Sequence, residues 1–300
     1  MMSHLMIQLT DTAWRPVAIV FFSLFLLQTA QAGGTRQLAT GGVSTIEGSA
    51  GGGLVPWAVL TGYATEEEVS ASAFYSRADT GDYILNATGV AVNFYNRLEL
   101  SYARQELDLV TLGPALGLPG ATLEQDIVGL KLRLFGDIIY TAAPQVSLGV
   151  QYKKNRSFSE TPSIPRIVGA EDEDGVDVYL SAAKLFLAGA GGYNLFVNGT
   201  VRYSKANETG LLGFGGPGDS DYDVTVGGAV GVLFTRRLAI GTEYRQKSGN
   251  LGLPESDWRD VFIAWFPNRH VSFTAAYVDL GEVATLPEQT GWYVSIQGSF

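Results

Sequence analysis

The chain has 300 residues, with 20 Lys and Arg against 30 Asp and Glu, giving a formal net charge of −10. A charge this negative argues against nucleic acid as a partner, because binding to phosphates needs clustered cations. The sequence contains no Cys, which excludes disulfides and thiolate chemistry. It is 46% hydrophobic with 37 Gly, 14 Tyr and 15 Phe, yet after residue 32 it has no apolar run of membrane-helix length, a combination that favours membrane strands.

Residues 1–32 have the layout of a secretory signal. Arg15 precedes an apolar run at 17–27, and the small-residue ending Gln28-Thr-Ala-Gln-Ala32 precedes two glycines. A membrane anchor is the alternative, but this run is shorter than the roughly 20 residues that a spanning helix needs. We therefore expect a signal peptide over 1–32 that is cleaved on export.

A glycine-rich segment follows at residues 33–53, where glycines allow tight turns and close backbone approach. In one interpretation, 38–47 and 54–63 are the first two strands of a sheet, joined by a flexible loop. That interpretation is preferred because it keeps the strand count even. In the other, the segment is a plug folded into a lumen, and its candidate residues are Gly41, Gly42, Glu47, Gly51, Gly52 and Gly53.

From about residue 54 onward, apolar residues alternate with small or polar ones, as at 146–153, 193–204 and 222–234. Successive side chains of a strand point to opposite faces, so each stretch has one apolar face and one small or polar face. Aromatic residues near both ends of several apolar faces match the interfacial girdles of a membrane barrel. Lys184 interrupts one alternation and suggests a bulge. In the stretch 258–266, either face could point outward.

Connections of two lengths separate these stretches. Short turns fall near 95–96, 189–192, 235–236 and 267–268, and long polar loops at 109–121, 156–174, 206–220, 250–256 and 281–289. Short periplasmic turns and longer external loops are typical of outer-membrane barrels. A soluble sandwich or propeller is the alternative, but strands of 11–14 residues exceed the usual length of about five or six in soluble sheets.

The last strand carries the most specific pattern. Trp292, Val294, Ile296 and Phe300 alternate with polar residues, and the sequence stops at Phe300. This pattern resembles the C-terminal assembly signal by which insertion machinery recognises bacterial outer-membrane barrels. We therefore predict an all-β, transmembrane, antiparallel up-and-down β-barrel of about 12–14 strands over residues 54–300, in a Gram-negative outer membrane.

Four segments carry a further resemblance, to the proteobacterial domain-of-unknown-function family three-zero-three-four. They lie at 39–57, 210–216, 266–270 and 275–281, within a similarity that runs from about residue 35 to the end. The resemblance implies an outer-membrane location. It implies no established activity, and it carries over no catalytic or binding residue.

Enzymatic function is disfavoured. Barrel enzymes that act on lipids need a His near the external rim, and the mature chain's one histidine, His270, falls in a predicted periplasmic turn. With no His/Cys cluster, we expect neither a metal site nor a cofactor. The acidic run at 171–174 does not match a calcium loop and is interpreted as a solvated external loop.

The inward face suggests a function. The candidate lumen-lining residues are Glu99, Lys131, Arg133, Lys153, Arg202, Glu243, Arg245 and Lys247. A surplus of cations in a low-dielectric wall favours anions; alternatively, these charges pair with one another or solvate a wet interior. We predict a porin-like channel or transporter for small solutes, with a modest anion preference and a narrow lumen. Its expected partners are outer-membrane lipid and lipopolysaccharide, the insertion machinery and the solutes. The alternative is a non-conducting structural or adhesion barrel that binds partners through its external loops.

Overall fold

The computed structural model describes residues 37–300, so the predicted signal peptide lies outside the described residues. Within this range, twelve antiparallel strands form a closed barrel, and each strand pairs with its neighbours in the sequence. The barrel strands are β3 (Val69–Asp79), β4 (Tyr83–Phe94), β5 (Leu98–Leu109), β6 (Thr122–Phe135), β7 (Gln145–Asn155), β8 (Asp174–Ala190), β9 (Tyr193–Ser204), β10 (Asp223–Thr235), β11 (Leu238–Arg245), β12 (Trp258–Trp265), β13 (Val271–Asp279) and β14 (Thr290–Ser299). The predicted fold class is confirmed, with a strand number at the lower end of the expected range.

The last strand closes the ring against the first. β14 pairs with β3 over eight residues, from Trp292 opposite Asp79 to Ser299 opposite Ser72. Beyond the strand, Phe300 and Ala71 exchange both backbone hydrogen bonds, with N···O distances of 2.8 and 2.9 Å. Closure leaves no unpaired strand edge, which a membrane-embedded sheet requires.

The strands have an exposed apolar face and a buried face that is largely polar. In β7, Ser147, Gln151 and Lys153 are buried, while Leu148 and Tyr152 are exposed. The ambiguity in β12 is also decided: its even-numbered residues point inward and its odd-numbered residues outward. The bulge predicted at Lys184 is misplaced, since the β8–β9 register continues through this residue and shifts only between Phe186 and Ala190.

Aromatic residues form belts on the outward face near both ends of the strands. Such belts lie at the two membrane interfaces of a transmembrane barrel. The ring pairs and their centroid distances are Tyr193–Phe234 at 5.1 Å and Trp265–Phe273 at 5.5 Å near the short turns, and Tyr203–Tyr222 at 4.8 Å and Tyr277–Trp292 at 5.4 Å near the long loops.

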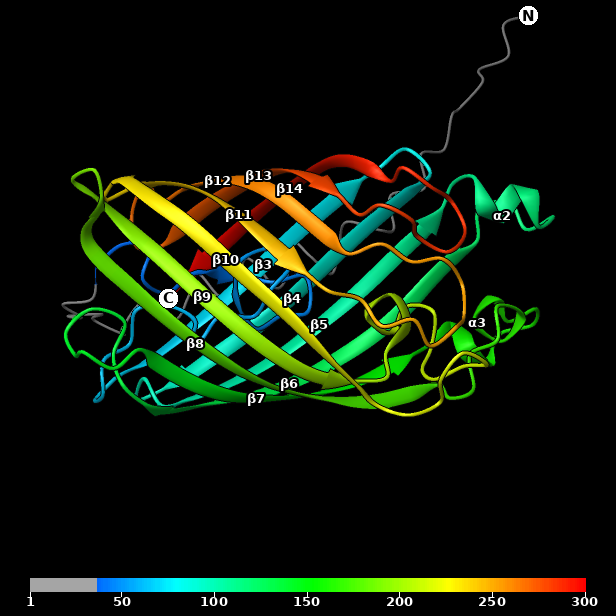
Figure 1. Cartoon of the computed structure of the whole chain (residues 1–300), viewed down its shortest axis with the longest axis horizontal. Coiled ribbons are helices and arrows are strands. Elements are labelled where there is room, and N and C mark those ends of the chain that lie inside the picture. The colour runs from blue at the N-terminus through cyan, green and yellow to red at the C-terminus, as the bar shows by residue number, and fades with distance from the viewer. Residues whose placement is uncertain (1–36) are drawn as a thin grey trace, which may run out of the picture. The chain divides into compact units, whose positions relative to one another are not determined.

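The two ends of the barrel differ. The long connections gather at one end, together with the short helices α2 (Leu112–Ala115), η1 (Ser157–Ser159), α3 (Ile164–Ile167) and η2 (Asn207–Gly210). The C-terminus and the short turns lie at the opposite end (Figure 1). By the convention of outer-membrane barrels, the long loops are external and the short turns periplasmic. Among residues 37–300, no helix is both long and apolar enough to cross a membrane.

Residues 37–64, the N-terminal segment, take no part in the barrel wall. They form a separate two-stranded sheet, β1 (Val43–Ser44) with β2 (Ala50–Gly51), and an irregular stretch after it. Every residue from 40 to 64 is buried. Figure 1 shows this segment, in blue, inside the ring of strands. The preferred interpretation of 38–47 and 54–63 as the first two barrel strands is therefore wrong.

An external connection also turns inward. Residues 207–216, the inward loop, are all buried. Asn155 of β7 donates from Nδ2 to the carbonyl oxygens of Gly210 and Leu211, at 3.0 and 2.7 Å. Gln125 of β6 donates to the carbonyl oxygen of Thr209 at 3.2 Å. The N-terminal segment and the inward loop thus occupy the lumen together.

Candidate functional site

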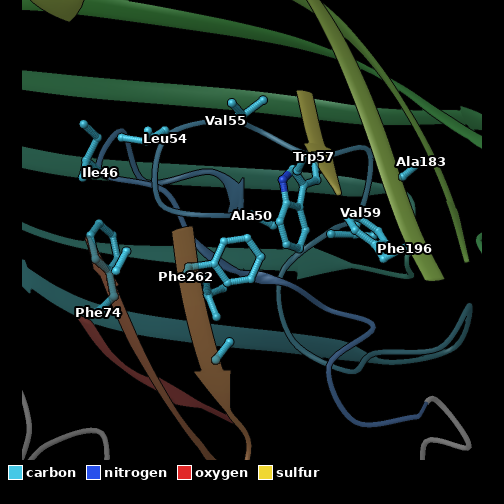
Figure 2. Close-up of a cluster of buried hydrophobic side chains, with 14 of the residues drawn as sticks. Ile46, Ala50, Leu54, Val55, Trp57, Val59, Phe74, Ala183, Phe196 and Phe262 are labelled. Atoms are coloured by element: carbon cyan, nitrogen blue, oxygen red, sulfur yellow. The ribbon is translucent and has the colours of Figure 1, made fainter. Parts of the chain in front are cut away.

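The N-terminal segment packs its apolar side chains against the inner wall of the barrel. The ring centroid of Trp57 lies 4.4 Å from that of Phe196 on β9 and 6.4 Å from that of Phe262 on β12. Figure 2 shows Trp57 between these strands, with Ile46 and Leu54 farther along the segment. These apolar contacts explain why a segment so rich in glycine is nevertheless fixed inside the lumen.

A cluster of buried charges surrounds Glu47 of the N-terminal segment. Its carboxylate accepts from Lys153 Nζ at 2.5 Å, Arg202 Nη2 at 2.7 Å and Arg245 Nη2 at 2.9 Å. These cations come from β7, β9 and β11, so one carboxylate links three strands of the wall. Asp177 of β8 completes the cluster. Its Oδ2 lies 2.7 Å from Lys153 Nζ and 2.7 Å from Arg202 Nη1. A charge buried at this depth is stable only when it is paired in this way.

Lys153 also connects the two segments inside the lumen. Its Nζ donates to Glu47 of the N-terminal segment and, at 3.0 Å, to the carbonyl oxygen of Thr209 in the inward loop. The Lys153 side chain is completely buried. Displacement of either segment would therefore remove a hydrogen-bond partner from the same buried ammonium group.

A second carboxylate, on Glu243 of β11, holds the backbone of the N-terminal segment. It accepts from the backbone N–H groups of Gly53, Leu54 and Val55 at 2.6, 2.9 and 3.3 Å. The indole Nε1 of Trp57 donates to the same carboxylate at 3.1 Å. A Cβ atom at Gly52 would lie 2.2 Å from Glu243 Oε1, so a larger residue here would displace the carboxylate from this close approach.

Glu99 and Lys131 hold the segment from the opposite part of the wall. Glu99 accepts from the N–H groups of Ala50 and Thr61 at 3.0 and 2.7 Å. Lys131 donates to the carbonyl oxygens of Ala50 and Val59 at 2.7 and 3.1 Å. Lys131 Nζ lies 3.4 Å from Glu99 Oε1, and both side chains are almost fully buried. Side chains of the wall thus satisfy backbone groups that a neighbouring strand would otherwise pair with.

The structure places six of the eight candidate lumen residues in these three groups around the N-terminal segment. The other two lie near the ends of the barrel. Arg133 donates to the carbonyl oxygen of Gly136 at 2.6 Å, in the periplasmic turn after β6. Lys247, just beyond the external end of β11, pairs with Glu208 of the inward loop and lies 3.5 Å from Glu255.

The predicted surplus of lumen cations is wrong for this structure, because four further carboxylates are buried in the lumen. Asp177 belongs to the odd-numbered residues of β8, which point inward, so the alternation along the strand predicts its position. Asp260 lies in the strand whose faces were ambiguous. Glu47 lies in the lumen only if the glycine-rich segment is a plug, and Glu208 enters the lumen because its loop folds inward.

Other predicted features lie away from this site. His270 is in the periplasmic turn before β13, with Nδ1 3.2 Å from the carbonyl oxygen of Ser299. In the external acidic run, Asp172 pairs with Lys205 at 2.6 Å and Glu173 with Lys154 at 3.0 Å. Across residues 37–300, no group of three or more His, Cys, Asp or Glu side chains is arranged to hold a metal ion.

The closed ring, its exposed apolar face, the aromatic belts and the occupied lumen define a transmembrane β-barrel of the outer-membrane type. The chain belongs to DUF3034, a family described as proteins of unknown function, whose model matches residues 40–297. This confirms the family resemblance seen in the sequence. None of the curated proteins matches this chain.

Several solved structures have a similar fold. The KdgM porin has a TM-score of 0.47 and 12% identity, with 77% of this chain and 99% of that chain covered. Omp33 of Acinetobacter baumannii has a TM-score of 0.44 and 10% identity, covering 78% and 98% of the two chains. Outer membrane phospholipase A from Escherichia coli has a TM-score of 0.35 and 7% identity, covering 80% and 92%. None of these likenesses is close enough to assign a function.

Proposed function

We propose that this protein is an outer-membrane channel or transporter for small solutes whose lumen is closed by the N-terminal segment acting as a plug. The observation that carries the proposal is the way in which the segment is held. The hydrogen bonds that join its backbone to the barrel wall go to side chains such as Glu99, Lys131 and Glu243. Contacts of this kind can break without opening the barrel sheet, so the segment can move while the wall stays intact.

The anion preference belongs to the open state in this proposal. With the N-terminal segment in place, Glu47 neutralises part of the charge of Lys153, Arg202 and Arg245. When the segment leaves, three cations remain beside one anion, Asp177, in this part of the lumen. A cationic constriction in a low-dielectric wall raises the local concentration of anions.

The same proposal assigns the remaining surfaces. The apolar outward face and its aromatic belts contact outer-membrane lipid, and the external loops face lipopolysaccharide. Trp292, Val294 and Ile296 point outward with exposures of 65, 50 and 39%, so the insertion machinery can reach the last strand from the lipid side. We assign no catalytic residue, because His270 lies at the periplasmic end, away from the external rim.

Single-channel conductance of the refolded chain tests the proposed function. We compare residues 33–300 with a variant that begins at residue 65 and so lacks the N-terminal segment. A plug predicts a closed full-length protein with rare openings and a shortened barrel that conducts in discrete steps. Heat-modifiable gel mobility shows whether each protein is folded. A folded and inserted shortened barrel that stays silent would contradict the channel and favour a structural or adhesion barrel.

A further inference from the structure

The barrel wall holds the Arg202 guanidinium in place without the help of the N-terminal segment. Arg202 Nη1 donates to Asp177 Oδ2 at 2.7 Å and to Gln151 Oε1 at 3.2 Å. The guanidinium also lies over the ring of Tyr179, with its Cζ 5.5 Å from the ring centroid. All three partners belong to β7 and β8, so the position of this cation does not depend on Glu47.

The Arg245 guanidinium is supported by the wall as well. Its Cζ lies 5.7 Å from the centroid of the Trp258 ring on β12, an arrangement in which cation and ring attract each other. Arg202 and Arg245 also line a polar pocket on the external side of the cluster, together with Lys247 and Thr225. The Arg202 and Arg245 side chains are 7 and 11% exposed. A small molecule in this pocket would therefore meet both guanidinium groups.

The charges of the wall at this point need an anion from elsewhere. Lys153 and Arg202 pair with Asp177 of the wall, but all three cations also pair with Glu47 of the N-terminal segment. If Glu47 leaves, three cations remain beside one anion. A buried charge that loses its counter-ion is strongly destabilised, so another anion that takes the place of Glu47 would be favoured.

We infer that Lys153, Arg202 and Arg245 form a binding site for the carboxylate group of a small solute, and that Glu47 occupies this site as an internal substitute. The two oxygens of Glu47 lie 3.1 and 2.7 Å from Arg202 Nη1 and Nη2, a two-point contact that a free carboxylate can reproduce. A carboxylate solute would compete with Glu47 and thereby release the plug. The release of the plug for transport rests on the proposed function, whereas the binding site itself does not.

Isothermal titration of residues 33–300, refolded in lipid nanodiscs, measures the binding of a free carboxylate. Glu47→Ala removes the side-chain carboxylate and leaves a space the size of acetate, so acetate is the probe. We expect acetate to bind at least tenfold more tightly to Glu47→Ala than to the natural chain, in which Glu47 fills the site. Acetamide has the same shape without the charge and should not bind. Equal acetate affinity in the two chains, or equal affinity for acetate and acetamide, would overturn the proposal.

Two further substitutions in the Glu47→Ala chain locate the site. Arg202→Lys keeps the charge but loses the two-point contact, and should weaken acetate binding at least fivefold. Lys154→Gln is the control, because Lys154 is 40% exposed and pairs with Glu173 outside the lumen; acetate binding should not change. Acetate binding that Arg202→Lys leaves unchanged would place the ligand elsewhere and overturn the assignment.

Hydrogen exchange at residues 40–64 gives a second readout. Glu47→Ala should exchange faster there than the natural chain, and acetate, but not acetamide, should slow it again by taking the place of the missing carboxylate. In the natural chain, acetate should instead speed exchange, because it competes with Glu47. Acetate that changes exchange in neither chain would overturn the proposal.

Heat-modifiable gel mobility shows whether Glu47→Ala is folded. If it is not, Glu47→Gln, which keeps the volume of the side chain, takes its place in the titration with the same order of affinities expected. Both measurements are made without transport. A silent shortened barrel would therefore remove the channel function and leave the binding site standing, whereas a conducting barrel that binds no acetate would do the reverse.

Discussion

Glu47 and Arg202 are 155 residues apart in the sequence and form a two-point ion pair inside the barrel. Arg202 Nη1 and Nη2 lie 3.1 and 2.7 Å from the two oxygens of the Glu47 carboxylate. A planar guanidinium fixes both the position and the orientation of a carboxylate that it meets in this way. The pair therefore ties the N-terminal segment to a defined place on β9.

The first prediction concerns this charge. Glu47→Gln keeps the shape of the side chain and removes the negative charge that Lys153, Arg202 and Arg245 share. Breaking a buried ion pair typically costs about 3–5 kcal/mol, and here the cost falls on docking of the N-terminal segment. We expect more frequent channel openings and faster hydrogen exchange at 40–64. Glu66→Gln, on the exposed stretch before β3, is the control; equal behaviour of the two variants would count against Glu47 as the main anchor.

The second prediction concerns the close approach at Gly52. Gly52→Ala places a methyl group within 2.2 Å of Glu243 Oε1, so the carboxylate must move away from the N–H groups it accepts from. Overpacking of this kind costs about 1–3 kcal/mol. Hydrogen exchange at residues 53–57 should rise. Gly249→Ala, where a Cβ meets no atom within 4 Å, should leave exchange there unchanged.

The third prediction concerns ion selectivity in the barrel that begins at residue 65. Reversal potentials in a salt gradient should show a modest preference for chloride. Replacing Lys153 and Arg202 with Gln should reduce or reverse it, because Asp177 then remains without its cations. Lys154→Gln is the matched control, since Lys154 follows Lys153 in the chain but points outward and pairs with Glu173 at 3.0 Å. A reversal potential that Lys153 and Arg202 do not affect would remove the basis for anion preference.

The fourth prediction is a pH dependence of the external loop between β11 and β12. Burial and the nearby charge of Glu208 raise the pKa of the Glu255 carboxyl to about 7 from its ordinary value of 4.5, although Lys247 acts in the opposite direction. Between about pH 4.5 and pH 7, the docked loop therefore binds more protons than the released loop. Its docking is strongest below about pH 4.5 and weakens as the pH rises through about 7.

Hydrogen exchange at residues 250–257 checks this pH dependence. Exchange there, corrected for its intrinsic rate, should be faster at pH 8 than at pH 6. Glu255→Gln should remove most of the difference, and Asp219→Asn, on an exposed part of another external loop, should not. A pH dependence that survives Glu255→Gln would assign the effect to a different group.

Much of the barrel follows from local pattern alone. The alternation in β7, β9 and β10 and the lengths of the connections depend only on the period of a strand and on which face meets lipid. For the same reason, the alternation of inward and outward residues along a strand is enough to predict that Lys153 and Arg202 point inward. These features depend only on residues close together in the sequence, so they can be predicted without knowing what fills the lumen.

The content of the lumen was decided only by the tertiary structure. Residues 38–47 and 54–63 are compatible with strands, and nothing local distinguishes a hairpin in the wall from a segment inside it. What selects the lumen is a set of partners far away in the sequence: Glu99, Glu243 and the cations around Glu47 satisfy the segment's polar groups, and Phe196 and Phe262 cover Trp57. Strand period is a local property, whereas the pairing of buried charges depends on which residues the closed ring brings together.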